Sequence, residues 1–412
     1  MRARGYDEGR LNAPLDQRGI SRRGFLKLVA AALLAGGCRR ARSSGAVLAL
    51  VNGQLIDGTG AEALPDAVVL VEGTRIAFVG LRQRVRVPAE AQVLDAEGAT
   101  ILPGLINAHV HAAYSESTLK AWAAGGVTTV RDLGNGGRRS ELFALRGRVQ
   151  AKPACARLVA AGPMVTVPGG YPIVPWGVSG LTVTSVDDAR QKVGALLDDG
   201  ADMIKIALES GATFGREIPM LSPAEAAAIV ALAHERGTLV SAHVTAARDV
   251  EVALDAGVDD LAHMVVDDLP DALIERAVAA GVYWVPTLEL WDGVSRAQGI
   301  DLDRRAIRNL GRYVAAGGKV ALGTDYAGYE TAFQLGTPIR EIELMLEAGM
   351  SPLQILVAAT AKAAQVCNLG SEIGTLESGK RADILAVEGD PLQDMQALTR
   401  VRWVLRDGAL IS

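Results

Sequence analysis

The sequence predicts an α/β protein in which a (β/α)8, TIM-like barrel is joined to a small β-sandwich domain built from both ends of the chain. Two patterns carry this prediction: a central region that alternates helix, glycine and strand, and two flanking regions rich in short β-forming runs. A chain of 412 residues with 49% hydrophobic residues can also bury a large core. We expect the sandwich to consist of residues 46–102 and 373–412, and the barrel of residues 103–372.

The flanking regions separate their β-forming runs with turn residues such as Asp57-Gly58 and Glu72-Gly73, and Asn52-Gly53 predicts a further turn. This pattern is typical of small antiparallel sheets. Neither region has enough strands for an independent core, so we expect the two to pair with each other. The expected strands are Val47–Val51, Gln54–Ile56, Ala67–Val71, Ile76–Val79, Gln92–Leu94, Ala382–Val387, Val401–Leu405 and Ala409–Ile411.

In the central region a glycine stands between most expected helices and the strand that follows, as at Gly200 and Gly237. Two helix starts carry a capping box with proline at the first helical position, at Ser222-Pro223 and Ser351-Pro352. Eight strands favour a closed barrel. The alternative, a doubly wound open sheet, is disfavoured because no Gly-x-Gly-x-x-Gly loop follows a strand. The expected barrel strands are Leu102–His111, Val127–Val130, Arg157–Ala160, Asp202–Ile206, Thr238–Ser241, Val258–Ala262, Val282–Val285 and Lys319–Leu322.

Polar residues stand at the C-terminal ends of five of these strands, which is where (β/α)8 enzymes build their active sites. His109 and His111 are two residues apart on one strand, so both imidazoles face the same side and can bind one metal ion. A His-x-His pair also arises by chance on a half-buried strand, and Lys205 alone would fit a lysine that reaches solvent from a strand end. His234 falls inside an expected helix and is expected to lie elsewhere. The candidate site residues are His109, His111, Lys205, His243, His263 and Asp325.

This set of residues resembles that of the amidohydrolase superfamily. The resemblance extends from Asn52-Gly53 through Leu102–His111, which reads Leu-Pro-Gly-Leu-Ile-Asn-Ala-His-Val-His, to Gly379–Ile384, which reads Gly-Lys-Arg-Ala-Asp-Ile. It implies a hydrolase with two divalent metal ions. We expect zinc, while manganese, iron and cobalt stay open. By the resemblance, one metal would be held by His109, His111 and Asp325 and the other by His243 and His263.

The resemblance also implies that Lys205 bridges the two metals. An ammonium group has no lone pair for a metal, so Lys205 would act as a carbamate formed with carbon dioxide. Two cations that share a water lower its pKa toward neutrality, and the bridging hydroxide would attack the substrate. Asp325, by its family position, would be the general acid/base that passes the proton to the leaving group.

The stretch Gly200–Ile206 is most similar to the branch that contains Xaa-Pro dipeptidases, related metallocarboxypeptidases and imidazolonepropionases. That similarity implies hydrolysis of a C–N amide bond in a short peptide, an N-acyl amino acid or a cyclic amide. Many peptidase-like members carry Gly-Gly-His-Gly where this chain has Pro168–Pro172, which reads Pro-Gly-Gly-Tyr-Pro. Tyr171 is therefore a candidate hydrogen-bond donor to the substrate, or an aromatic residue that packs this loop. Tyr114 and Tyr326 are further candidate substrate contacts, and Arg131 and Arg138 are candidate clamps for a carboxylate.

Two other function classes stay open. A metal-activated hydroxide also attacks esters, lactones and phosphotriesters, so the chain could be a hydrolase of that kind. The other alternative is a non-catalytic surface-binding lipoprotein, which the complete set of candidate ligands disfavours.

The N-terminal segment resembles a twin-arginine export signal. Arg22-Arg23 precede the apolar run Leu28–Leu34, which is too short to span a bilayer comfortably; the alternative is a buried amphipathic helix. Ala35–Cys38 resembles a lipoprotein cleavage box. We therefore expect a signal peptide at residues 1–37, lipidation and membrane attachment at Cys38, and a linker at residues 38–45. The expected partner is the twin-arginine export machinery, and the expected location is the periplasm or the outer face of the membrane.

The charge balance excludes nucleic acid as a natural partner. Removal of residues 1–37 would take away seven Lys/Arg and three Asp/Glu, which moves the net charge from −5 to about −9. Besides Cys38 the chain has only Cys155 and Cys367, so no disulfide framework is implied. The expected partner at the site is a small molecule or short peptide, and assembly into a homo-oligomer stays open.

Overall fold

The computed structural model describes residues 47–411, apart from 114, 135, 137, 138 and 328–334. The predicted signal peptide, Cys38 and the linker therefore lie outside the described residues, as do Tyr114 and Arg138. Within the described part of the chain, no helix has the length and apolar character needed to cross a membrane.

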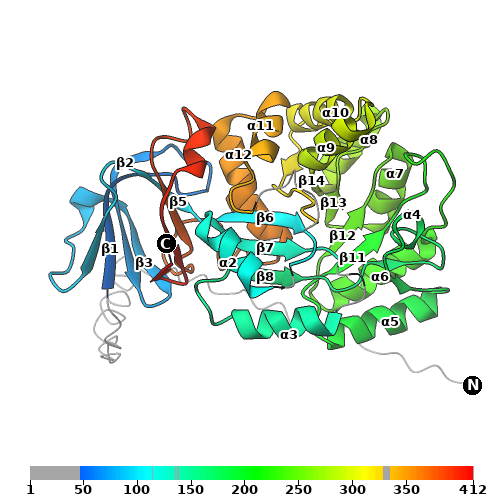
Figure 1. Ribbon diagram of the computed structural model, residues 1–412, viewed down its shortest axis with the longest axis horizontal. Helices are drawn as coiled ribbons and strands as arrows, with labels where there is room; N and C mark the ends of the chain where they lie inside the picture. Colours follow the sequence, from blue (N-terminus) through cyan, green and yellow to red (C-terminus); the bar gives the residue numbers. More distant parts are fainter. Residues whose placement is uncertain (1–46, 114, 135, 137–138, 328–334, 412) are drawn as a thin grey trace, which may run out of the picture. The chain divides into compact units, whose positions relative to one another are not determined.

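Strands from both ends of the chain form one eight-stranded sheet, as the sequence predicts (Figure 1, blue and red). The order is β18-β17-β16-β5-β1-β2-β3, and β4 pairs with β1. The two ends meet where β16 runs antiparallel to β5, with Ile384 opposite Pro103 and Val387 opposite Thr100. The strands are β1 (Val47–Leu55), β2 (Leu64–Glu72), β3 (Arg75–Leu81), β4 (Gln92–Asp95), β5 (Thr100–Pro103), β16 (Ile384–Val387), β17 (Val401–Arg406) and β18 (Ala409–Leu410).

Alternating side chains give this sheet two apolar faces. Leu50 and Val69 belong to one buried cluster, while their neighbours Ala49 and Val68 belong to another. The predicted turn at Asn52-Gly53 is wrong: both residues lie inside β1. Asn52 has a φ of 59°, and the pairing of β1 with β2 shifts register between Leu50 and Gly53, so these residues form a bulge.

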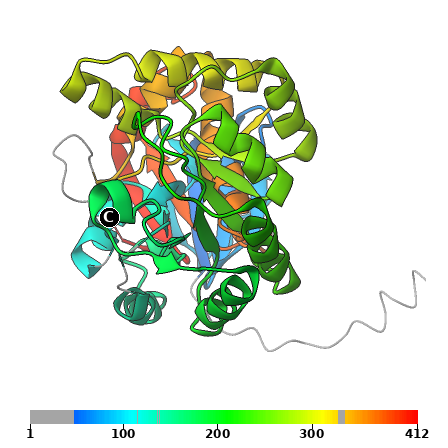
Figure 2. The ribbon, with the colours of Figure 1, turned by 90° about the vertical axis from the view of Figure 1, so that its right-hand side faces the viewer.

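Eight parallel strands form the predicted barrel (Figure 2). They fall into a three-stranded sheet, β6-β7-β8, and a seven-stranded sheet that also contains β9 (Val165–Thr166) and β10 (Leu181–Thr182). Backbone hydrogen bonds join the two sheets. Ala108 donates to Leu322 across 2.8 Å on one side, and Asp202 donates to Ala160 across 3.0 Å on the other. The barrel strands are β6 (Leu105–Val110), β7 (Val127–Asp132), β8 (Arg157–Ala160), β11 (Ile204–Ala207), β12 (Val240–His243), β13 (Asp260–Ala262), β14 (Tyr283–Val285) and β15 (Lys319–Val320).

Helices surround the barrel strands (Figure 2). Both predicted capping boxes are present, at Ser222 with Glu225 and at Ser351 with Gln354. The helices are α2 (Glu116–Ala124), α3 (Arg139–Val149), α4 (Ile173–Trp176), α5 (Val186–Asp198), α6 (Pro223–Glu235), α7 (Ala247–Ala256), α8 (Asp271–Ala280), α9 (Leu288–Gln298), α10 (Asp303–Ala315), α11 (Ile339–Glu347), α12 (Pro352–Val357) and α13 (Ala363–Val366), with the π-helical turn η2 (Ala358–Lys362) and the 3-10 turns η1 (Arg82–Arg84) and η3 (Met395–Thr399).

Gly104 divides the strand that the sequence predicts at Leu102–His111. Leu102 and Pro103 belong to β5 of the outer sheet, and the barrel strand β6 begins at Leu105. A Cβ atom at Gly104 would lie 2.3 Å from Oγ1 of Thr128, so only glycine fits this close approach to β7. The chain passes from the sheet into the barrel at this residue.

We predict that the same substitution at two glycines has opposite effects. Gly104→Ala should lower the free energy of unfolding by about 1–3 kcal/mol, because the new methyl group overlaps Thr128. Gly147→Ala should raise it by about 0.5–1 kcal/mol, because Gly147 lies within α3 with open space around it. Urea unfolding followed by circular dichroism measures both. Equal stability of the two variants would contradict the proposed close approach.

Candidate functional site

The structure places all six candidate residues at the C-terminal ends of barrel strands. His109 lies in β6 and His111 follows it, Lys205 lies in β11, and His243 ends β12. His263 follows β13, and Asp325 lies beyond β15. Most of this site is shielded from solvent, since His109 and Lys205 are fully buried and the side chains of His111 and Asp325 are 25% and 16% exposed.

Three potential metal-ligand atoms, from His109, His111 and Asp325, lie close together in the site. Nε2 of His109 and Nε2 of His111 each lie 3.0 Å from Oδ1 of Asp325 and 3.3 Å from each other. His263 joins them, since ligand atoms of His109, His263 and Asp325 all lie within 4.8 Å of one another. Two ligand atoms bound tetrahedrally at about 2.1 Å from one zinc ion lie about 3.4 Å apart. The spacing therefore fits a shared metal ion, which would also relieve the repulsion between the three lone pairs.

The protonation states suit a cation as well. Burial holds the pKa of His109 and of His263 well below the usual range, so both imidazoles are neutral near pH 7. Burial alone would raise the pKa of Asp325, but the interaction with His109 and the contact with His111 hold it well below its usual range, and contact with Asp325 raises the pKa of His111 in turn. Neutral imidazoles beside a carboxylate form a set of donors that a divalent cation completes.

Further contacts orient the histidine rings. Nδ1 of His111 lies 2.9 Å from the carbonyl oxygen of Gly134. Because a carbonyl only accepts, that nitrogen carries a proton, so Nε2, which contacts Asp325, is the ring nitrogen that a metal ion would bind. Nδ1 of His263 lies 2.8 Å from Oγ1 of Thr287, an arrangement that likewise leaves Nε2 free for a metal.

The backbone at these strand ends is strained. His263 and Asp325 have φ values of 73° and 64°, and Ala112 and Thr287 have 55° and 48°. Residues other than glycine rarely adopt this left-handed region, and such strain clusters at functional sites where the surrounding structure enforces it. Here it turns candidate ligands inward directly after their strands end.

Lys205 is fully buried, and its Nζ has no hydrogen-bond partner among the described residues. Burial lowers its pKa to about 7, because the attraction of Asp260 and Asp325 does not offset burial and the nearby charge of Arg131. A sizeable fraction of Lys205 is therefore an uncharged amine at neutral pH, which is the form that reacts with carbon dioxide.

Arg131 does not reach the rim as the carboxylate clamp considered from the sequence. It is buried inside the barrel, where it donates to Asp260 across 2.8 and 3.1 Å and to the carbonyl oxygens of Ala108 and Val366. Ser241 also donates to Asp260 across 2.7 Å. Arg131 therefore stabilises the barrel interior beneath the site.

A row of aromatic side chains extends from His243 toward solvent. Tyr171 stacks on the His243 ring with centroids 4.0 Å apart and planes inclined by 18°. The ring centroid of Phe214 lies 6.3 Å from that of Tyr171 and 6.1 Å from that of Trp176, which is 60% exposed. Tyr326 instead packs edge-on against the buried Trp122 of α2, with centroids 5.0 Å apart. Tyr171 thus begins an aromatic row that leads from a candidate ligand to solvent.

Two buried acids near the site are absent from the sequence-based set. Asp132 ends β7 and accepts hydrogen bonds from the backbone N–H groups of Ala113 and Gly134, and burial raises its pKa to about 6. Glu209 lies just after β11, with Oε2 3.4 Å from Nε2 of His243. Asp132 ends its strand and Glu209 lies two residues after one, and an acidic residue at such a position is the signal that could have identified them.

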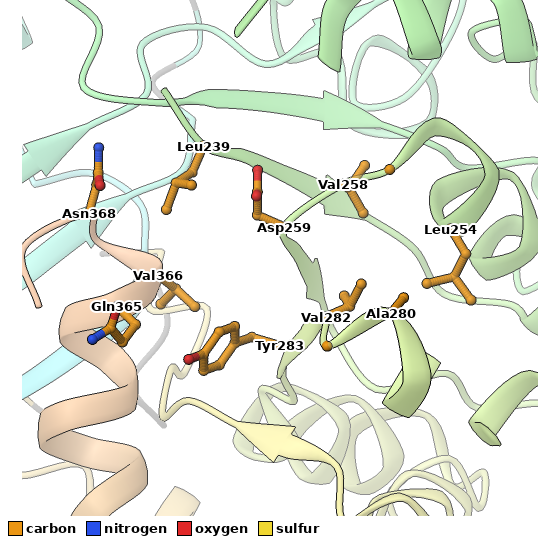
Figure 3. A pocket seen from close by; sticks show the side chains of 12 residues that line it. Leu239, Leu254, Val258, Asp259, Ala280, Val282, Tyr283, Gln365, Val366 and Asn368 are labelled. Atoms are coloured by element: carbon orange, nitrogen blue, oxygen red, sulfur yellow. The ribbon is translucent and has the colours of Figure 1, made fainter. Parts of the chain in front are cut away.

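A separate cavity of about 340 Å³ lies at the opposite end of the barrel (Figure 3). Its lining includes Leu239, Val258 and Val282, which precede β12, β13 and β14, together with Gln365 and Asn368. This cavity therefore lies at the N-terminal strand ends and does not belong to the candidate site.

Comparisons with known proteins agree with this geometry. Residues 100–410 match the model of the amidohydrolase family. The chain is 26% identical to an ochratoxinase of Aspergillus niger over 85% of this chain and 83% of the relative. It is also similar to the crystal structure of a Xaa-Pro dipeptidase with bound methionine in the active site (TM-score 0.78, 26% identity, 89% and 99% of the two chains). The structure of phenylurea hydrolase B is similar too (TM-score 0.75, 25% identity, 89% and 97%).

The family match spans most of the chain and includes all six candidate residues. It confirms the predicted resemblance and the predicted class of enzyme, a hydrolase that acts on carbon–nitrogen bonds. The chain belongs to the amidohydrolase family.

Proposed function

We propose that this protein hydrolyses the C–N amide bond of a short peptide, an N-acyl amino acid or a cyclic amide with the help of two divalent metal ions. The observation that carries the proposal is the convergence of Nε2 of His109, Nε2 of His111 and Oδ1 of Asp325 at 3.0–3.3 Å, together with the buried Lys205, whose Nζ has no hydrogen-bond partner in the described part of the chain. Relatives named ochratoxinase, Xaa-Pro dipeptidase and phenylurea hydrolase support the hydrolytic reaction and leave the substrate open.

The ligands in this proposal are the ones that the resemblance to the amidohydrolase family implies. His109, His111 and Asp325 would hold one ion, and His243 and His263 the other, with Lys205 between them as a carbamate. The rings of His243 and His263 lie 4.7 Å apart, close enough to share an ion. Zinc suits a site of imidazoles and carboxylates. When bound, such ions polarise a substrate carbonyl and lower the pKa of water.

The side chains of this chain supply the remaining steps. The Asp325 carboxylate lies where the candidate ligands converge and is mostly shielded from solvent, so it would be placed to take a proton from the attacking water and deliver it to the leaving nitrogen. Lys205 would become anionic when its neutral amine forms an N–C bond to carbon dioxide and releases one proton. The row of Tyr171, Phe214 and Trp176 offers an apolar surface to the substrate beside His243.

We predict that metal content depends on His263 and not on His234. The wild-type protein should bind about two divalent ions per chain, and His263→Asn should bind about one or fewer because a ligand is lost. His234 lies on α6 with Nε2 3.0 Å from Asp259, away from the site, so His234→Asn should keep both ions. Inductively coupled plasma mass spectrometry of zinc-loaded protein gives the stoichiometry. Equal content in the two variants would contradict the assignment of His263.

A second prediction concerns the carbamate. Protein equilibrated with ¹³C-labelled bicarbonate should show one carbamate resonance by NMR, and Lys205→Ala should abolish both the resonance and turnover. Lys362→Ala is the matched control, because burial also lowers the pKa of Lys362 but this lysine lies on η2 outside the site. A resonance that persists in Lys205→Ala would show that another amine carries the modification.

A third prediction concerns the bond cleaved. Zinc-loaded enzyme should turn over members of a panel of dipeptides, N-acyl amino acids and cyclic amides with higher kcat/KM than aryl esters, lactones or phosphotriesters. Trp176→Ala should raise KM several-fold for amides with large apolar groups, with little effect on kcat, because Trp176 is exposed and lies far out on the aromatic row. Turnover of esters without turnover of amides would establish the alternative reaction.

We also propose, from the sequence, the domain boundaries given above and export by the twin-arginine route with attachment through Cys38. Residues 1–46 lie outside the described residues, so these proposals depend on Arg22-Arg23, the apolar run after them and Cys38. We likewise propose that the metal is zinc, that the twin-arginine export machinery is a partner, and that the protein lies in the periplasm or at the outer face of the membrane.

A further inference from the structure

Glu209 is a fully buried carboxylate that the proposed ligand set does not use. It lies in the segment after β11, four residues beyond Lys205, where its oxygens point at three donors. The backbone N–H of Gly211 donates to Oε1 across 2.6 Å, and Oγ1 of Thr245 donates to Oε2 across 2.5 Å. Nε2 of His243 lies 3.4 Å from the same Oε2.

These contacts leave Glu209 no access to a substrate. Both oxygens already accept hydrogen bonds, and the side chain has no exposed surface. Its remaining contact with the site is His243.

That ion-pair contact favours one of the two ring nitrogens of His243 as the site of the proton. An ionised carboxylate accepts only, so it favours a proton on Nε2 and leaves the lone pair on Nδ1. In the described part of the chain neither ring nitrogen of His243 makes a hydrogen bond, and the ion-pair contact of Glu209, at 3.4 Å, is with Nε2 and not with Nδ1. In His111 and His263 it is instead Nδ1 that contacts a residue outside the set of candidate ligands, namely Gly134 and Thr287.

The ring of His243 is fixed from two directions. Tyr171 stacks on its face, and Glu209 contacts its edge. Glu209 is itself held by Thr245, whose hydroxyl lies 2.7 Å from that of Thr213. Movement of the imidazole is therefore opposed both within the ring plane and perpendicular to it.

We propose that Glu209 is a positioning residue that holds His243 in the Nε2–H form and presents Nδ1 as the metal-binding nitrogen. The proposal rests on the proposed function in one respect, namely that His243 binds a metal. Carboxylates that hold the distal nitrogen of a ligating histidine orient the ring and increase its basicity, and their loss commonly weakens metal binding or activity about 10–100-fold.

The test compares three variants in the full chain. Glu209→Gln removes the charge with little change of shape, Glu209→Asp keeps the charge on a shorter side chain, and Thr245→Val leaves Glu209 in place but removes one of its donors. Zinc dissociation constants are measured by competition with a chelator. We expect Glu209→Gln to bind the more weakly held ion about 10–100-fold less tightly, and Glu209→Asp and Thr245→Val to show smaller losses.

Asp383→Asn is the matched control for loss of a buried carboxylate. Asp383 is 4% exposed and pairs with Arg157 away from the site, so its replacement should leave zinc affinity unchanged. A merely structural role of Glu209 predicts that Glu209→Gln and Asp383→Asn lower the melting temperature of the metal-free protein alike and that both retain wild-type zinc affinity.

The tautomer of His243 can be measured in the metal-free protein. The chain has 5 histidines, so selective ¹⁵N-histidine labelling gives few signals, and the signal of His243 is assigned with His243→Asn. We expect an Nε2–H tautomer in metal-free wild type and a mixture of tautomers in Glu209→Gln. An unchanged tautomer together with unchanged zinc affinity in Glu209→Gln would overturn the proposal. Wild-type protein that binds no zinc would instead refute the proposed metal function, while the tautomer measurement still decides the role of Glu209.

Discussion

Closure of the barrel is the constraint on which the site depends. The backbone N–H groups of Thr324 and Asp325 donate to the carbonyl oxygen of His109 across 3.2 and 2.9 Å, which ties the last barrel strand to the first. The side chain of Asn107 strengthens this seam, because it donates to Oγ1 of Thr324 and accepts from the backbone N–H groups of His109 and Thr324. Asp325 meets His109 and His111 only because this seam is closed.

Burial is the second constraint, and it acts on the whole set of side chains at once. Removal of water lowers the pKa of His109, His263 and Lys205 and would raise that of Asp325, so each group is driven toward its uncharged form unless a neighbour prevents it. The result is a group of lone pairs with few protons between them. A cation is the species that stabilises such a group.

Much of the architecture and the six candidate residues could be predicted because their signals are local. Glycines before strands and β-forming runs located the barrel strands, and the polar residues at strand ends followed from them. Asn52-Gly53 was wrongly predicted as a turn because pairing with β2 turns this dipeptide into a bulge. The ion pair of Arg131 with Asp260 and the contact of Glu209 with His243 join different strands, and such contacts depend on register and depth within the barrel, which one strand does not encode.

The joint between β5 and β16 has a consequence for biosynthesis. The strand that leads through Gly104 to His109 has a sheet partner far downstream in the sequence, since Leu102 pairs with Leu385. While the ribosome is still making the chain, β5 keeps one open edge and the segment that carries the first histidines lacks its anchor. The anchor of this segment therefore forms only after β16 has been synthesised, so the first two candidate histidines are fixed in place late in folding.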